Sequence, residues 1–274
     1  MFNQFLILAL FLSCSLAAQE KGLPADRQGQ EKGYHFPAEN LEYSIWWGKP
    51  LGIFPSKIIK AGTGFITTKI TTRSLHPAMM IKAGGGSIGL THLIYPVNNF
   101  TKVNADPITF RPLSVYSSIE QGEYFRVTKM EFDYKENIFF YDDRLRDGPT
   151  MKITIDSVIF QNKNVFDLVT SSMLVRHINL QPADTLILDI FQPDEKSFPL
   201  KIVVLRRETI ETIFGETRCL VIEPMLKNYA ALFIKYGPLY IWLTDDDKKI
   251  PVKAETELII GKIIVQLEKY EITQ

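Results

Sequence analysis

Short runs of β-branched and aromatic residues, separated by turn-forming residues, make up most of this chain and restrict what it can fold into. In the clearest run, KMEFDY, the apolar residues Met130, Phe132 and Tyr134 alternate with charged ones. An alternation of period two places the apolar side chains on one face of a strand and the charged side chains on the other. A sheet with one solvent-exposed face is typically antiparallel. Runs of this kind occupy residues 41–48, 64–72, 124–134, 137–143, 151–157, 185–191, 200–212, 218–224, 239–245 and 257–270.

The pattern therefore predicts an all-β fold, an antiparallel meander that forms a barrel or a strongly curved half-barrel. Residues 164–180 depart from it, because Val169 and Met173 recur at helical spacing. Asp167 near the start and Arg176 near the end suit the helix dipole. We expect one short helix here, covering or entering the concave side of the sheet.

The amino-terminal residues MFNQFLILALFLSCSLAA resemble a secretory signal peptide, with an apolar run followed by small residues. The run is shorter than the roughly 18–20 apolar residues that span a membrane. We therefore expect cleavage near Ala17 or Ala18, export to the periplasm, and no transmembrane segment in the mature chain. The alternative is a lipoprotein anchored through Cys14. The predicted organisation is a signal peptide (1–18), a disordered polar tether (19–34) and a single β-barrel-like domain (35–274).

Charge and cysteine content exclude several classes of protein. Thirty-one basic residues balance thirty-one acidic ones, so the chain lacks the electrostatic footprint of a nucleic-acid-binding protein. After removal of the signal peptide, Cys219 is the single cysteine and cannot form an internal disulfide. Its strand-like surroundings favour a small buried hydrophobe over a nucleophile.

The glycine-rich stretch GGGSIG (84–89) satisfies G-x-G-x-x-G, which in dinucleotide-binding folds joins a strand to a helix. The residues that follow, THLIYPV (91–97), read as another strand, so a bend or a close backbone approach is favoured instead. The four histidines lie in separate segments without a shared ligand spacing, and neither a metal site nor a cofactor is predicted. They are His35, His76, His92 and His177.

Adjacent acidic residues raise the question of an acid/base or cation site. Asp142–Asp143 and Asp245–Asp247 are both expected at turns, where aspartate bonds local backbone N–H groups. Asp245–Asp247 fails the EF-hand pattern, and two lysines follow it, so a hairpin loop is favoured over a calcium site. The glycosylation sequon at residues 99–101 predicts an exposed loop.

Aromatic side chains give the best indication of a binding surface. If Trp46 and Trp47 lie in a strand, one ring faces the core and the other faces solvent or a cavity, where it can stack on a sugar or a lipid chain. Asp167 and Arg176 are expected either to fix the helix on the sheet or to contact a ligand. The candidate ligand-binding residues are Tyr43, Trp46, Trp47, Asp167, Arg176 and Trp242.

Three blocks resemble one known family. FPAENLEYSIWWGKPLGIF is similar to its opening strand, D167LVTSSMLVR176 to its central helix, and GPLYIWLTDDDKKIPVKAETELIIGKIIVQL to its closing hairpin. The blocks occur in family order and span almost the whole mature chain. The family is domain-of-unknown-function family 3108, a set of exported bacterial proteins. The resemblance implies a periplasmic β-rich domain and implies no activity.

These observations support a non-enzymatic exported domain that binds an apolar or amphipathic ligand, lipid-like or glycan, in the concavity of the sheet. The alternative is an envelope protein that docks on a partner through an outer face or edge and has a filled core. A hydrolase with a site assembled from turns is a third hypothesis. Interior volume separates the first two, whereas an enzyme requires titratable groups that converge in a cleft.

Overall fold

The computed structural model describes residues 38–48, 59–160, 164–191, 198–226, 236–258 and 261–273. The predicted signal peptide, its cleavage sites, Cys14 and the predicted tether lie outside this part of the chain, as does His35. Most of the described residues belong to strands and few to helices, which confirms the all-β prediction.

The strands form one 15-stranded sheet in the order β8-β7-β6-β5-β4-β3-β2-β1-β15-β14-β13-β12-β11-β10-β9. Neighbours are antiparallel except β9 and β10, which are parallel. The strands are β1 (Ala38–Gly48), β2 (Ile59–Arg73), β3 (His76–Ser87), β4 (Val97–Ala105), β5 (Pro112–Gln121), β6 (Tyr124–Asp133), β7 (Ile138–Arg146), β8 (Met151–Ile159), β9 (Val165–Phe166), β10 (Thr185–Ile190), β11 (Phe198–Thr212), β12 (Gly215–Leu226), β13 (Tyr236–Thr244), β14 (Pro251–Leu258) and β15 (Gly261–Thr273).

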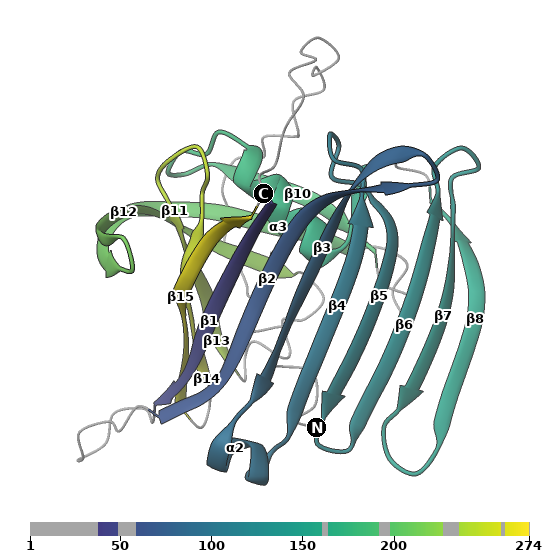
Figure 1. The fold of residues 1–274 in the computed structure, drawn as a ribbon, viewed down its shortest axis with the longest axis horizontal. Coiled ribbons are helices and arrows are strands. Elements are labelled where there is room, and N and C mark those ends of the chain that lie inside the picture. The colour runs from purple at the N-terminus through teal and green to yellow at the C-terminus, as the bar shows by residue number, and fades with distance from the viewer. Residues whose placement is uncertain are drawn as a thin grey trace.

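The sheet is strongly curved and open, so the half-barrel alternative describes it (Figure 1). Two sequence-local meanders, β1–β8 and β9–β15, meet where β1 pairs with β15. Bulges occur at Glu268 of β15 and at Ala61 of β2, both opposite β1, and at Leu205 of β11, opposite β12. A bulge adds a residue to one strand and increases the local twist, which helps a wide sheet to curl.

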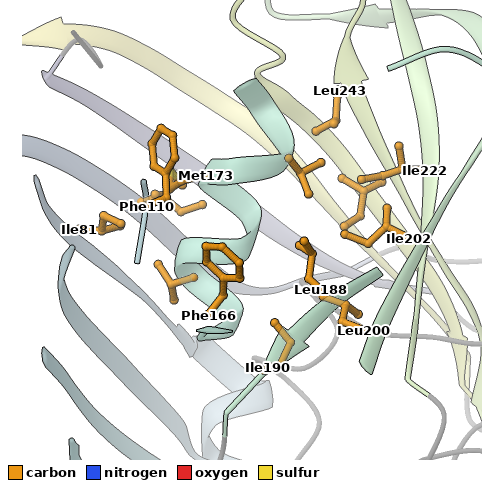
Figure 2. Close-up of a cluster of buried hydrophobic side chains, with 14 of the residues drawn as sticks. Ile81, Phe110, Phe166, Met173, Leu188, Ile190, Leu200, Ile202, Ile222 and Leu243 are labelled. Atoms are coloured by element: carbon orange, nitrogen blue, oxygen red, sulfur yellow. The ribbon is translucent and has the colours of Figure 1, made fainter. Parts of the chain in front are cut away.

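Helix α3 (Leu168–His177) lies in the concavity, as Figures 1 and 2 show. It is shorter than the predicted 164–180, because Val165 and Phe166 pair with β10 as β9. Asp167 then starts the helix as an extended N-cap, and Ile178 ends it in an extended conformation. A second helix, α2 (Gly89–Ile94), occupies part of the stretch expected to be a strand.

Two further expectations about turns are wrong. Asp142 and Asp143 lie within β7, and the sequon residue Asn99 is buried in β4. Apolar residues flank both sites, so the strand continues through the polar positions. Turn propensity is a local signal, and pairing with two neighbouring strands overrides it here.

The core divides at α3 into two regions of different composition. On the β5–β8 side, aromatic rings stack on one another, including Phe139 against Phe191 at 4.9 Å between centroids and Phe160 against Phe191 at 5.9 Å. These contacts join β7 to the end of β10 across the concavity. On the β11–β15 side the buried side chains facing α3 are mainly aliphatic, as Figure 2 shows for Leu200, Ile202 and Ile222.

Candidate functional site

A pocket lies between α3 and the concave face of the sheet, on the aliphatic side of the helix. The pocket is open on one side, and the empty space in and in front of it, open solvent included, is about 750 Å³. The wall opposite the helix is formed by Leu200, Ile202, Ile222, Ile241 and Leu243 of β11, β12 and β13 (Figure 2). The remaining surface includes Tyr43, Ile66, Ala254 and Val265 of the sheet and Leu168, Met173 and Val175 of α3.

The polar side chains that line the pocket, on the strands and on α3, already have partners within the protein. The Tyr43 hydroxyl donates to the carbonyl of Pro251 at 3.0 Å, and burial raises the pKa of Tyr43 above its usual range. Ser171 and Ser172 donate to carbonyls three residues earlier in α3. Lys253 lies 3.0 Å from a carboxylate of its own strand. The pocket therefore presents a hydrocarbon-like surface to whatever enters it.

Arg176 is the remaining polar residue that lines the pocket, and it holds α3 on the sheet. Its guanidinium forms two bonds to the Glu39 carboxylate of β1, at 2.5 and 3.1 Å. Its Nε donates to the carbonyl of Lys248, in the loop between β13 and β14, at 3.1 Å. The Arg176 and Glu39 side chains are 4% and 0% exposed, so the pair is shielded from water. Two-point contact of this kind fixes the rotation of the helix.

Asp167 anchors the other end of α3. Its carboxylate accepts hydrogen bonds from the backbone N–H of Val169 at 2.8 Å and of Thr170 at 3.2 Å. The Thr170 hydroxyl closes a capping box. Burial raises the pKa of Asp167, and these hydrogen bonds oppose that rise. This arrangement satisfies the free N–H groups of the helix start, which is a structural task.

The three tryptophans among the predicted ligand-binding residues do not line the pocket. Trp47 packs against the core, whereas Trp46 is on the opposite face of β1 and donates to the Ser44 hydroxyl at 2.7 Å. Trp242 is buried, with the ammonium of Lys253 4.3 Å from its ring centre. Of the six predicted residues, Tyr43 and Arg176 line the pocket, whereas Asp167 and the tryptophans do not.

The aspartates between β13 and β14 shape a loop. Asp245 accepts from the guanidinium of Arg207 at 2.9 Å and forms an ion pair with Arg218 at 3.0 Å. Asp246 accepts from the Thr244 hydroxyl at 2.7 Å and from the backbone N–H groups of residues 248 and 249. Asp247 is exposed. Two arginines and two backbone donors occupy these carboxylates, so the loop has the contacts of a turn and not those of a cation site.

Within the described ranges, no group of three or more His, Cys, Asp or Glu side chains converges as a metal site. His177 is packed against Phe110 with ring centroids 4.5 Å apart, and burial lowers its pKa. Cys219 is fully buried, and burial raises the pKa of its thiol to about 11. A thiol with such a pKa is a poor nucleophile at neutral pH.

The glycines of GGGSIG permit close contact between strands. A Cβ at Gly84 or Gly86 would lie 2.8 Å from a carbonyl oxygen of β4, and one at Gly85 2.9 Å from a carbonyl oxygen of β2. Gly89 and α2 follow, but β4 then returns antiparallel to β3. A dinucleotide site requires a parallel β-α-β unit, so the stretch lacks that context.

The same stretch contains G-x-S-x-G at residues 85–89, the pattern that surrounds the nucleophilic serine of α/β-hydrolases. Ser87 Oγ lies 3.1 Å from His92 Nδ1 and also 3.1 Å from the carbonyl oxygen of Tyr95. It accepts from the N–H of Val97 at 2.8 Å. A nucleophile elbow exposes its serine on a strained turn. Ser87 is buried and makes backbone contacts, which is the arrangement of a turn-stabilising hydroxyl.

Sequence reasoning missed the aliphatic residues that form most of the pocket wall. They come from several strands that are distant in the sequence, and each occupies an inward position of an alternating strand. The alternation predicts that these residues face inward. It carries no information on whether inward side chains meet a neighbour or leave a hollow.

The fold and the site define a class: an open, curved, β-barrel-like sheet with a helix in its concavity. The chain belongs to the family of proteins of unknown function DUF3108, whose model matches residues 42–268. The chain resembles a β-barrel-like protein of the domain-of-unknown-function family DUF1849 from Brucella abortus, with a TM-score of 0.51 and 8% identity. That likeness covers 87% of this chain and 98% of the other, and it concerns the fold alone.

A protein with a YmcC-like fold from Bacteroides fragilis matches with a TM-score of 0.29 and 10% identity, over 86% of this chain and 96% of that one. No curated protein sequence matches this chain. Across the described ranges, the helices are too short or too polar to cross a bilayer.

Proposed function

We propose that this protein is an exported, non-catalytic binding protein for a ligand with a hydrocarbon chain. The observation that carries the proposal is the apolar pocket between α3 and the sheet. Export is supported by the signal-peptide-like composition of residues 1–18. Binding sites for small molecules are concave and mostly apolar, and this pocket has both properties.

The chemistry of the wall defines the part of the ligand that the pocket accepts. The polar side chains among the described wall residues are engaged by the protein, so a polar ligand group placed there would lose its hydrogen bonds to water without replacement. Burial of a methylene group, by contrast, contributes about 0.8 kcal/mol. The pocket therefore selects an alkyl or isoprenoid chain, and the polar end of the ligand remains outside the pocket.

Displacement of a fluorescent fatty acid, cis-parinaric acid, from the purified full chain tests this proposal. The informative variant is Ala254→Phe, because Ala254 is a small residue of the pocket wall and a phenyl ring there would occupy the hollow. The matched control is Gln266→Phe, which places the same ring at an exposed position of the adjacent strand β15. We expect Ala254→Phe to weaken binding at least tenfold and the control to bind as the wild type does.

Equal binding by Ala254→Phe, Gln266→Phe and the wild type would show that the dye sits elsewhere and would overturn the proposal. Melting temperatures of both variants separate a filled pocket from a damaged fold. A ring that fills an existing hollow preserves stability, whereas overpacking of a filled core costs about 1–3 kcal/mol.

A second candidate function, association between two copies of the chain, is favoured by the edge strand β8. Its outward residues Ile153, Ile155 and Ile159 are 57%, 73% and 75% exposed. An exposed apolar edge strand is a template for pairing with another strand. If two β8 strands pair antiparallel about Ile155, Lys152 of one copy lies diagonal to Asp156 of the other, so the charges are complementary.

Sedimentation of the wild type and of Ile155→Lys tests this association. The wild type is expected to sediment as a dimer, and the variant as a monomer, because it places two lysines opposite each other across the pairing axis. A wild type that stays monomeric at high concentration would eliminate the candidate.

A further inference from the structure

The concave face of β4 and β5 contains buried polar atoms that have no hydrogen-bond partner among the residues that the structure describes. Both polar atoms of the Gln121 carboxamide and the Nδ2 of Asn99 are buried without a hydrogen bond. The two residues are 1% and 2% exposed. A buried polar group without a partner costs about 1–3 kcal/mol, so each such group in a native protein requires an explanation.

Strand register places these groups on the same face as the pocket. Tyr43 of the pocket wall pairs with Gly64, Gly64 with Gly85, and Gly85 with Asn99. Directly paired residues share a face of the sheet, and neighbouring strands are about 4.8 Å apart. Asn99 therefore lies roughly 14 Å from Tyr43 along this row. Gln121 is diagonal to Asn99, because Asn99 pairs with Ile119.

Two glycines occupy the row between the pocket wall and the carboxamides. Gly64 and Gly85 carry no side chain, and the atoms nearest to a Cβ built on either are those of neighbouring strands. Neither of the two residues between Tyr43 and Asn99 in this row therefore contributes a side chain to the face. Asn99 Oδ1 accepts from the backbone N–H of Glu120 at 3.1 Å. The atoms left for a ligand are therefore Asn99 Nδ2 and both polar atoms of Gln121.

The charges beside the carboxamides neutralise each other. Arg126, which pairs with Ile119, donates to the Asp143 carboxylate at 2.8 and 3.1 Å. Asp143 also accepts from the Thr128 hydroxyl at 2.7 Å. An anionic head group would compete with a formed ion pair, whereas a neutral group that donates and accepts would complement Gln121 and Asn99.

We propose that Asn99 and Gln121 form a head-group subsite that binds an uncharged, hydroxyl- or amide-bearing group on the ligand whose chain occupies the pocket. This inference rests on the proposed function and adds the polar half of the ligand. The distance of roughly 14 Å between the two regions suits an amphipathic lipid with its chain in the pocket and its head over β4 and β5.

Competition between two probes of equal chain length tests the subsite. Monopalmitoylglycerol carries a neutral head that donates and accepts, and methyl palmitate carries the same chain without a donor. We expect the wild type to bind monopalmitoylglycerol about tenfold more tightly. Gln121→Met keeps the length of the side chain and removes both polar atoms, so it is expected to abolish this preference and to retain the affinity for methyl palmitate.

The outcomes separate the two proposals. Failure of both probes to bind the wild type overturns the proposed function and the subsite together. Equal affinity of the wild type for the two probes, as expected if Asn99 and Gln121 hold buried water only, overturns the subsite alone. Because Gln121→Met removes unsatisfied polar atoms, its melting temperature is expected to equal or exceed that of the wild type. The comparison of the two probes on the wild-type protein tests the subsite even if the variant does not fold.

Discussion

Arg176 of α3 and Glu39 of β1 form a doubly bonded ion pair that is almost fully excluded from solvent. The two residues are separated by 137 positions in the sequence. Taking both charges out of water is costly, and their mutual attraction is available only in this geometry. The pair therefore makes the position of α3 specific, and with it the width of the pocket.

Arg176→Ala is expected to lower the free energy of unfolding by about 3–5 kcal/mol, because it leaves the Glu39 carboxylate buried without its partner. The double variant Arg176→Met/Glu39→Leu removes both charges and is expected to recover most of that loss. Urea unfolding of the single and double variants measures both values. An Arg176→Ala protein as stable as the wild type would show that the pair does not hold the helix.

Glu223 of β12 is expected to make stability depend on pH. Burial raises its pKa from the usual 4.5 to about 7. A raised pKa in the folded state means that the protonated form is favoured there, so the stabilisation is complete below pH 4.5 and is lost as the pH rises through 7. We expect a loss of about 1–2 kcal/mol between these limits, once solvent screening is allowed for.

Glu223→Gln should remove this pH-dependent contribution, and urea unfolding between pH 4.5 and 8 measures it. Glu216→Gln, at an exposed position of the same strand, is the matched control and should retain the wild-type profile. Parallel profiles for the two variants would contradict the assignment to Glu223.

Two glycines of β2 are expected to differ in their tolerance of a methyl group. A Cβ at Gly62 would lie 2.5 Å from the carbonyl oxygen of Gly86, whereas the nearest atom to one at Gly64 is 3.3 Å away. Gly62→Ala therefore forces strands apart and should cost about 1–3 kcal/mol, with a smaller cost for Gly64→Ala. Thermal unfolding compares the two, and equal values would argue against close strand contact as the reason for Gly62.

In the loop between β13 and β14, Asp246 and Asp247 should respond differently to removal of the carboxylate. Asp246→Ala deletes the acceptor of three hydrogen bonds and is expected to destabilise the protein by about 1–2 kcal/mol. Asp247→Ala, at an exposed position, should stay within about 0.5 kcal/mol of the wild type. Melting curves with calcium and with a chelator should coincide, and a calcium-dependent shift would restore the cation interpretation.

The amino-acid pattern predicts the fold better than the site. Period-two alternation is repeated in strand after strand, and the helix carries its own start signal in Asp167, so the architecture follows from local physics. Local residue preferences also led to two wrong predictions, a turn at Asp142–Asp143 and an exposed loop at residues 99–101, because both segments lie in strands. Asp143 has its partner in Arg126, which lies on a neighbouring strand and is chosen by register.

The pocket depends on an even less local property. Whether Ile222 and Ile241 touch α3 or leave space depends on sheet curvature and on where Arg176 fixes the helix, and neither quantity is encoded in one segment. Aromatic content points to Trp46 and Trp47, yet the pocket is made of branched aliphatic side chains. The candidate residues recovered from sequence, Tyr43 and Arg176, belong to blocks that resemble the family pattern.

The pairing of β1 with β15 has a consequence for the order of folding. Each meander can form from contacts between successive strands, but the joint between them must bring Ile45 and Val265 together across most of the chain. Closing so long a loop carries an entropic cost before any contact compensates for it. The seam should therefore form late, with φ-values near zero at Ile45. Until it forms, Glu39 of β1 is not in place to hold Arg176, and α3 is not fixed against the aliphatic wall.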